Sequence, residues 1–108
     1  MPPVFHLILS PEATANLQEI HEHIRISSPQ NAARMVDRIL NVIEKLEDFP
    51  HRNVVEYQSK KLKHPVRSIV VKPYLIFFRV IESQQVVRIL SVRHAARRRP
   101  AQFDTPKQ

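Results

Sequence analysis

The hydrophobic period changes once along the chain, near residue 50, and this change constrains the fold more than any other feature. Before it, apolar residues recur every three to four positions, which is typical of helices with one apolar side. After it, apolar residues alternate or run together over short segments, which is typical of strands. Helices grouped before a run of strands predict an α+β fold.

Two helix starts precede this change, and each places a proline directly after a serine, at Ser10-Pro11 and at Ser28-Pro29. A serine side chain accepts a hydrogen bond from a free backbone N–H, and proline fits the first helical position. The apolar stripes of the two helices are Ala13, Leu17, Ile20 and Ile24, then Ala32, Val36, Ile39, Leu40, Ile43 and Leu46. Because residues 26–28 make a short connection, the two helices should form an antiparallel hairpin.

Five strands are predicted, at residues 4–9, 54–57, 66–71, 74–81 and 86–92. In 74–81 both alternating sets are largely apolar, which suits a central strand covered on both faces. We expect Val86, Leu90 and Val92 to point inward from the last strand. The order β-α-α-β-β-β-β predicts a helical hairpin packed on a small, twisted, mostly antiparallel sheet, preceded by an N-terminal strand.

The chain has 108 residues with neither cysteine nor glycine. A disulfide framework, a thiolate metal site and a glycine-rich phosphate loop are therefore excluded. We expect one domain over residues 1–100 and a basic tail over 101–108. No apolar run of membrane-spanning length occurs, and the start does not have the pattern of a signal peptide. We therefore expect a cytoplasmic protein without a cofactor.

The net charge is +7, and arginine supplies most of the excess. Beyond residue 88 there are several arginines and a single acid, Asp104. Such a surface attracts nucleic acid, an acidic protein segment or a membrane surface, and a plain solvated tail is the simpler alternative. Arginine suits two-pronged contacts to carboxylate or phosphate, and charge alone does not choose between these ligands.

Few residues are spaced for catalysis. His21 and His23 do not share a helix face, so they cannot chelate one metal ion, and we expect no metal site. His94 is either a general base, a partner contact or an ordinary surface histidine. Glu19 and Glu22 fit a solvated helix face. The basic residues between Lys60 and Arg88 either hold RNA, stabilising charge on a scissile phosphate, or receive an acidic partner.

An ordered set of segments resembles the RelE/ParE superfamily of toxins from bacterial type II toxin–antitoxin systems. The set covers about residues 5–100 and consists of residues 5–9, Ser10-Pro11 and Ala13, the stripe Leu17, Ile20 and Ile24, Ser28-Pro29 with Ala32 and Ala33, Ile43, Leu46, Phe49-Pro50, residues 67–70, 74–80 and 89–97. The resemblance implies the same fold: a helical hairpin on a small, twisted, mostly antiparallel sheet.

The resemblance also implies one of two mechanisms. Members of the RelE-like branch cleave mRNA on the ribosome, with an arginine after the tyrosine that opens the central strand. They place another arginine in the turn after the last strand and an aromatic hydroxyl near the end. In this chain these positions hold Leu75, Ala95 and about Ala101, and Phe103 has no hydroxyl. The acid–base and charge-stabilising set is therefore incomplete.

The turn Val92-Arg93-His94-Ala95-Ala96-Arg97 and the trailing Pro100 resemble the ParE-like branch, apart from Ala95, where the family usually has glycine. Members of this branch poison DNA gyrase and block replication without bond-breaking residues of their own. The resemblance implies an acidic antitoxin as partner, in a hetero-oligomer. The expected target-facing residues are Arg93, His94, Arg97, Arg98 and Arg99. The expected antitoxin contacts are Arg67, Arg79 and Arg88.

Two alternatives stay open. The first is a ribosome-dependent mRNA endoribonuclease in which Lys61, Lys63, Arg93 and His94 act as catalytic groups. The second is a toxin-like binding module without toxicity. Arg79 also has a structural alternative, an ion pair with Glu82 or Glu56.

Overall fold

The computed structural model describes residues 4–48, 50, 54–57 and 64–96, and of residues 54–57 it describes the backbone. The elements, in chain order, are β1 (His6–Leu9), α1 (Pro11–Arg25), α2 (Pro29–Lys45), β2 (Val54–Tyr57), β3 (Val66–Val71), β4 (Tyr74–Ile81), a short 3-10 helix (Glu82–Gln84) and β5 (Val86–His94). The order of helices and strands is the predicted one.

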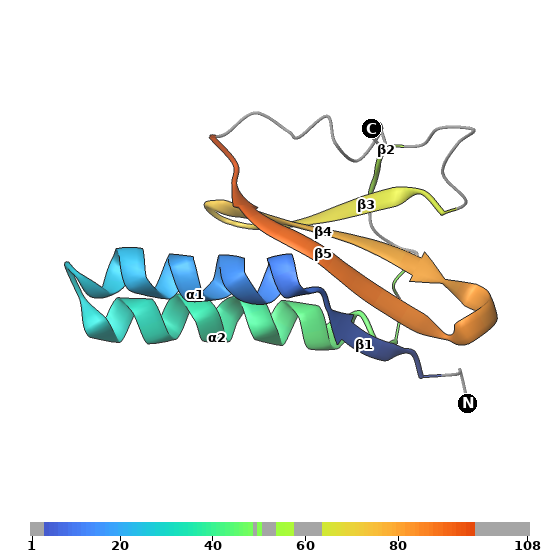
Figure 1. Cartoon of the computed structure of the whole chain (residues 1–108), viewed down its shortest axis with the longest axis horizontal. Coiled ribbons are helices and arrows are strands. Elements are labelled where there is room, and N and C mark those ends of the chain that lie inside the picture. The colour runs from blue at the N-terminus through green and yellow to red at the C-terminus, as the bar shows by residue number, and fades with distance from the viewer. Residues whose placement is uncertain (1–3, 49, 51–53, 58–63, 97–108) are drawn as a thin grey trace.

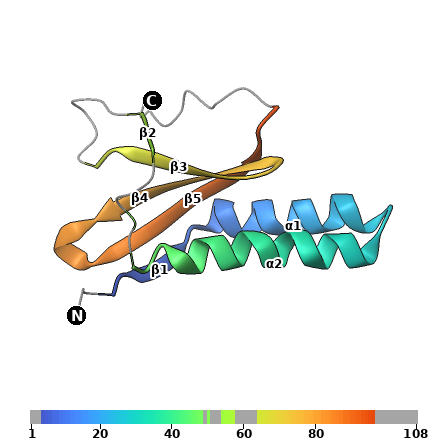
Figure 2. The same ribbon diagram turned by 180° about the vertical axis from the view of Figure 1, so that it is seen from behind.

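The strands form one sheet in the order β1-β5-β4-β3-β2. β1 pairs with β5 in parallel, and the other three pairings are antiparallel. The two helices lie side by side along one face of the sheet, as both views show (Figures 1 and 2). The prediction of an α+β fold with a helical hairpin on a mostly antiparallel sheet is confirmed.

Both helices begin where the serine–proline pairs predict. The Ser10 hydroxyl accepts a hydrogen bond from the backbone N–H of Ala13 at 3.0 Å, and the Ser28 hydroxyl accepts one from Asn31 at 3.2 Å. A proline follows each cap at the start of the helix. Neither helix among the described residues has the length and apolar content needed to cross a lipid bilayer.

The main core lies between the helices and the sheet. It takes alternate residues of β4, which are Tyr74, Ile76, Phe78 and Val80, together with the predicted stripe of α1. The other residues of β4 point to the opposite face, which carries neither of the two described helices and which we call the helix-free face. There Leu75 and Phe77 form a smaller buried cluster with Val66. β4 is thus apolar on both sides because it is central in the sheet and buried on both faces.

The prediction for the last strand is partly wrong: the core side of β5 starts from Val87 and Ile89, and a β-bulge then brings Val92 to the same side. Phe78 pairs with Ile89 and Phe77 pairs with Ser91, so Leu90 is an extra residue without a partner on β4. Val92 points into the main core as expected, whereas Leu90 packs against the cluster on the helix-free face. A bulge of this kind shifts the alternation of side chains by one residue.

The turn between β4 and β5 needs a residue in the left-handed region, and in a chain without glycine Gln85 takes this conformation. Its φ is 55° and its ψ is 46°. The backbone N–H of Gln85 donates to the Glu82 carbonyl at 3.0 Å, and its own carbonyl accepts from His6 at 2.8 Å. The turn therefore connects the β4–β5 hairpin to the start of β1.

Candidate functional site

The end of β5 is fixed to α1 by side chains where its pairing with β1 stops. That pairing ends at Leu9 and Ile89. Directly after it, the Ser10 hydroxyl donates a hydrogen bond to the Leu90 carbonyl at 2.8 Å. The Asn16 side-chain oxygen then accepts a hydrogen bond from the Val92 N–H at 2.9 Å. Beyond the end of β1, these side-chain bonds pair backbone groups of β5 that β1 no longer reaches. The last residues of β5 therefore have a fixed position relative to α1.

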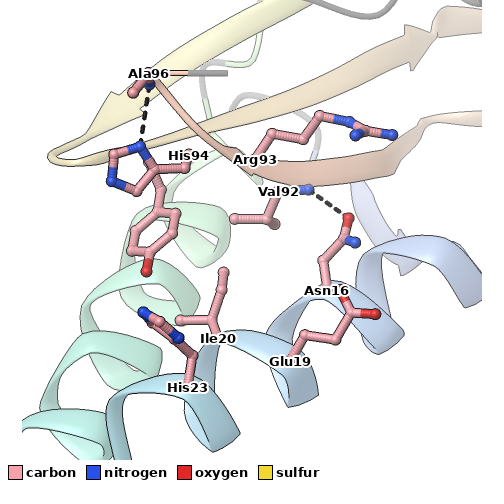
Figure 3. A pocket seen from close by; sticks show the side chains of 9 residues that line it. Asn16, Glu19, Ile20, His23, Val92, Arg93, His94 and Ala96 are labelled. Atoms are coloured by element: carbon pink, nitrogen blue, oxygen red, sulfur yellow. Dashed lines mark hydrogen bonds between the residues drawn. The ribbon is translucent and has the colours of Figure 1, made fainter. Parts of the chain in front are cut away.

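A pocket of mixed polar and apolar lining lies between α1 and this end of β5, with a volume of about 410 Å³ (Figure 3). Its lining residues come from α1, β4 and β5 and the turn after β5: Asn16, Glu19, Ile20, His23, Tyr74, Val92, Arg93, His94 and Ala96. The pocket combines an apolar floor with an acid, two histidines and an arginine. Sequence reasoning placed only Arg93 and His94 among the site residues and assigned Glu19 to a solvated helix face.

Arg93 and His94 leave β5 in different directions (Figure 3). The Arg93 guanidinium forms an ion pair with Glu12 in the first turn of α1, with an N–O distance of 2.8 Å. The His94 ring lies 5.4 Å from the Tyr74 ring at an interplanar angle of 79°. His94 Nδ1 accepts a hydrogen bond from the Ala96 N–H at 3.0 Å, so a neutral His94 carries its proton on Nε2.

Arg79 and Arg88 face each other directly across β4 and β5. Both point to the helix-free face, since Arg79 alternates with Phe77 along β4. Arg79 is half-buried and Arg88 is exposed. Burial first, and the positive charge of Arg88 second, lower the pKa of Arg79 from its ordinary value.

Arg67, the third residue predicted to bind the antitoxin, lies on the other side of the sheet. It pairs with Phe78, which belongs to the main core under the helices. The structure therefore brings Arg79 and Arg88 together and leaves Arg67 apart. Sequence alone does not show this division, because it depends on which strand positions are paired.

The suggested ion pair between Arg79 and Glu82 is absent. Among the described residues, no acidic side chain bonds to Arg79, and its Nε atom is buried without a hydrogen-bond partner. The Glu56 side chain, the other suggested partner, lies outside the described residues. Within the part of the chain that the structure describes, Arg79 therefore carries its charge half-buried and without an acidic partner.

Several predicted site residues lie outside the part of the chain that the structure describes: Lys61, Lys63, Arg97, Arg98 and Arg99, and with them the tail 101–108. Within the described ranges, no group of three histidine or acidic side chains is placed to hold a metal ion.

The resemblance matches two of the described residues to arginines of the RelE-like branch, and both have uncharged side chains. Leu75 is only 7% exposed and packs against Val66 and Phe77. Ala95 lies in the turn after β5, where its N–H donates to the Pro73 carbonyl at 2.7 Å. Neither side chain carries a charge that could stabilise a scissile phosphate.

The fold defines a class of small α+β proteins in which a helical hairpin covers one face of a mixed sheet. A toxin–antitoxin ParDE structure from P. aeruginosa is similar at a TM-score of 0.68 and 20% identity, over 84% of this chain and 96% of that chain. The RelBE2 toxin–antitoxin complex from Mycobacterium tuberculosis gives 0.64 and 14%, over 88% and 95%. At sequence identities this low, the structural similarity shows only that the fold is shared.

Sequence similarity identifies the family of this chain. Residues 7–99 match the family model described as the ParE toxin of the type II toxin–antitoxin system parDE. Toxin RelE2 of Caulobacter vibrioides is 32% identical over 85 residues, which are 79% of this chain and 89% of that protein. The chain therefore belongs to the ParE toxin family, within the RelE/ParE superfamily of type II toxins.

Proposed function

We propose that this chain inhibits DNA gyrase, and thereby DNA replication, and that a cognate antitoxin neutralises it. The observation that carries the choice of target is the environment of Leu75. An apolar, buried side chain stands where the resemblance places an arginine of the RNA-cleaving relatives. Its neighbours Val66 and Phe77 are apolar too, so an arginine at this position would have a buried charge without a polar partner among them. The membership in the ParE toxin family supports the same target.

The proposed target surface begins at the end of β5. Arg93 and His94 are held by Glu12, Tyr74 and Ala96, so their positions are fixed before any target binds. Three further arginines, Arg97, Arg98 and Arg99, follow within five residues of His94 in the sequence. Such a concentration of positive charge supports binding to an anionic surface, as the DNA-bound gyrase would present.

The proposed antitoxin is an acidic segment that meets this chain at its arginines. A net charge of +7 favours an acidic partner through faster encounter and complementary contacts. Arg79 and Arg88 form one candidate contact on the helix-free face, and Arg67 forms a separate one on the other side of the sheet.

RNA cleavage is the second candidate, and the pocket beside α1 is the observation that favours it. Glu19, His23 and His94 line this pocket and are suited to move protons, while Arg93 lies at its edge. The relative from Caulobacter vibrioides is also named a RelE toxin. In this alternative, Lys61, Lys63, Arg93 and His94 would be the catalytic groups on ribosome-bound mRNA.

The deciding experiment is pulse labelling of DNA and protein synthesis directly after this chain is expressed alone in bacteria. An early fall in thymidine incorporation, with protein synthesis persisting, supports gyrase as the target. An early collapse of amino-acid incorporation contradicts it and favours RNA cleavage. Undisturbed growth contradicts both and leaves a binding module without toxicity.

A second experiment uses purified gyrase and a supercoiling assay. Replacing Arg97, Arg98 and Arg99 by alanine should weaken inhibition by about 10-fold or more, because three charged contacts are lost. The control variant replaces Arg34, Arg38 and Lys45, which are exposed cations of α2, and removes the same charge. Equal loss in both variants would mean that net charge, and not this segment, determines inhibition.

A further inference from the structure

We propose that Arg79 and Arg88 form a clamp for a single carboxylate, supplied by an acidic side chain of the antitoxin when it docks on the helix-free face of the sheet. The inference rests on the proposed antitoxin partner and names the chemistry of one contact in that interface.

The strand register places two arginine side chains next to each other on one face of the sheet. Arg79 and Arg88 are direct cross-strand neighbours, and side chains in such pairs start about 4.5–5.5 Å apart at Cβ. On the other side of Arg88, in the same row of the sheet, lies Ile8 of β1, which is 39% exposed. The row therefore presents two arginines next to an accessible apolar side chain.

In the chain without its partner, repulsion between Arg79 and Arg88 destabilises the fold at this position. Like charges that lie directly opposite each other destabilise a sheet. Among the described residues neither arginine has an acidic partner, and the buried Nε of Arg79 has no acceptor. A bound carboxylate would offset the repulsion between the two charges, because its two oxygens can accept from the terminal nitrogens of both guanidinium groups.

The surroundings favour a protein carboxylate over the phosphates of a nucleic acid. Nucleic-acid surfaces neutralise several phosphates along a track of cations. Here an exposed apolar side chain, Ile8, lies next to Arg88 in the same row, and Arg67 lies on the other side of the sheet. Two cations beside an accessible apolar side chain fit an acidic residue that is flanked by an apolar residue in a peptide segment.

The test compares Arg79→Gln and Arg88→Gln with Arg38→Gln, which removes the same charge from an exposed position of α2. Titration calorimetry with the purified cognate antitoxin should show about 10- to 100-fold weaker binding for each clamp variant. The double variant should lose less than the product of the single losses, since both arginines bind one carboxylate. Arg88→Lys should bind more tightly than Arg88→Gln but less tightly than the wild-type chain, because lysine keeps the charge and lacks the planar pair of N–H donors that bonds both oxygens of a carboxylate.

A second measurement needs no partner. Because Arg88 is exposed, Arg88→Gln removes repulsion without opening the core, and the melting temperature of the free chain should rise by about 1–5 °C. Arg88→Glu should raise it further, since the new carboxylate lies opposite Arg79. An unchanged or lower melting temperature in both variants would overturn the idea that the pair is strained.

The outcomes separate this inference from the proposed function. If the wild-type chain does not bind its antitoxin, the proposed function fails. If it binds, and the clamp variants bind as tightly as Arg38→Gln, the clamp is wrong and the antitoxin partner stands. Binding of short single-stranded DNA is measured in parallel. If Arg79→Gln and Arg88→Gln weaken DNA binding as much as antitoxin binding, the two arginines form a phosphate site and the carboxylate clamp is wrong. If the variants instead abolish self-association seen by sedimentation, the carboxylate comes from a second copy of this chain.

Discussion

Glu12 and Arg93 form an ion pair at 2.8 Å although they lie 81 positions apart in the sequence. The pair joins the first turn of α1 to the last residues of β5, next to the proposed target surface. The side chain of Arg93 is 25% exposed and that of Glu12 is 51% exposed. Solvent therefore screens the pair, and its role is to orient Arg93 more than to stabilise the fold.

A double-mutant cycle on Glu12→Gln and Arg93→Gln should give a coupling of about 0.2–1 kcal/mol in urea unfolding at low salt. The coupling should fall when salt is added, because the pair is partly exposed. Glu12→Gln alone should cost slightly more than the coupling, since its charge also interacts with the start of α1. A coupling that persists at high salt would show that the pair is more buried than the structure indicates.

Ser10 and Ser28 should differ in their contribution although both cap a helix. Ser28→Ala removes one exposed cap bond and should cost about 0.5–1 kcal/mol. Ser10→Ala also removes the hydrogen bond to the Leu90 carbonyl, so it should cost about 1 kcal/mol more, in total about 1.5–2 kcal/mol. Urea unfolding of the two variants checks the difference, and equal losses would mean that the bond to β5 adds nothing.

Gln85→Gly should stabilise the chain by about 0.5–1 kcal/mol, because glycine adopts positive φ without the steric cost of a side chain. Gln85→Ala is the matched control: it removes the side-chain bond to the Glu82 carbonyl and keeps the strain. Alanine should therefore be neutral or destabilising in thermal unfolding. If alanine stabilises as much as glycine, the cause is the glutamine side chain and not its backbone.

Glu22 should make stability slightly pH-dependent. The hydrogen bond from Arg25 first, and the charge of Arg25 second, lower the pKa of Glu22. A carboxyl with a lowered folded pKa stabilises the native state above its unfolded pKa, and this contribution is lost as the pH falls through the folded pKa. The effect should therefore be present at neutral pH and fade below about pH 4.5.

Glu22→Gln should remove this small acid-dependent part, measured as the difference between urea midpoints at neutral and acidic pH. Arg25→Gln should remove the same part, because the pair causes the shift. If the Arg25 variant keeps the full pH dependence of the wild-type chain, the pair is not its source.

Local signals in the sequence predicted the elements well because their causes are local. The caps Ser10 and Ser28, and the two apolar sides of β4, are set by neighbouring residues and by burial of a central strand. The family resemblance added the same fold. These features need no knowledge of distant contacts.

The candidate site was harder to predict because its contacts join distant parts of the chain. Asn16 bonds to Val92 and Glu12 to Arg93, and no spacing rule links residues so far apart. The separation of Arg67 from Arg79 and Arg88 depends on strand register, which the apolar pattern does not specify when both faces are buried.

The extra residue at Leu90 also affects how this chain is compared with its relatives. With regular alternation after Ile89, Ser91 and Arg93 would point toward the helices, and Val92 and His94 would point away. The extra residue reverses this, so His94 lies beside Tyr74 and Arg93 is paired with Leu75, although the Arg93 guanidinium still bonds to Glu12 of α1. In a relative without the bulge, the counterpart of His94 is therefore the residue one position earlier. A gapless alignment of this strand would exchange the roles of its arginine and its histidine.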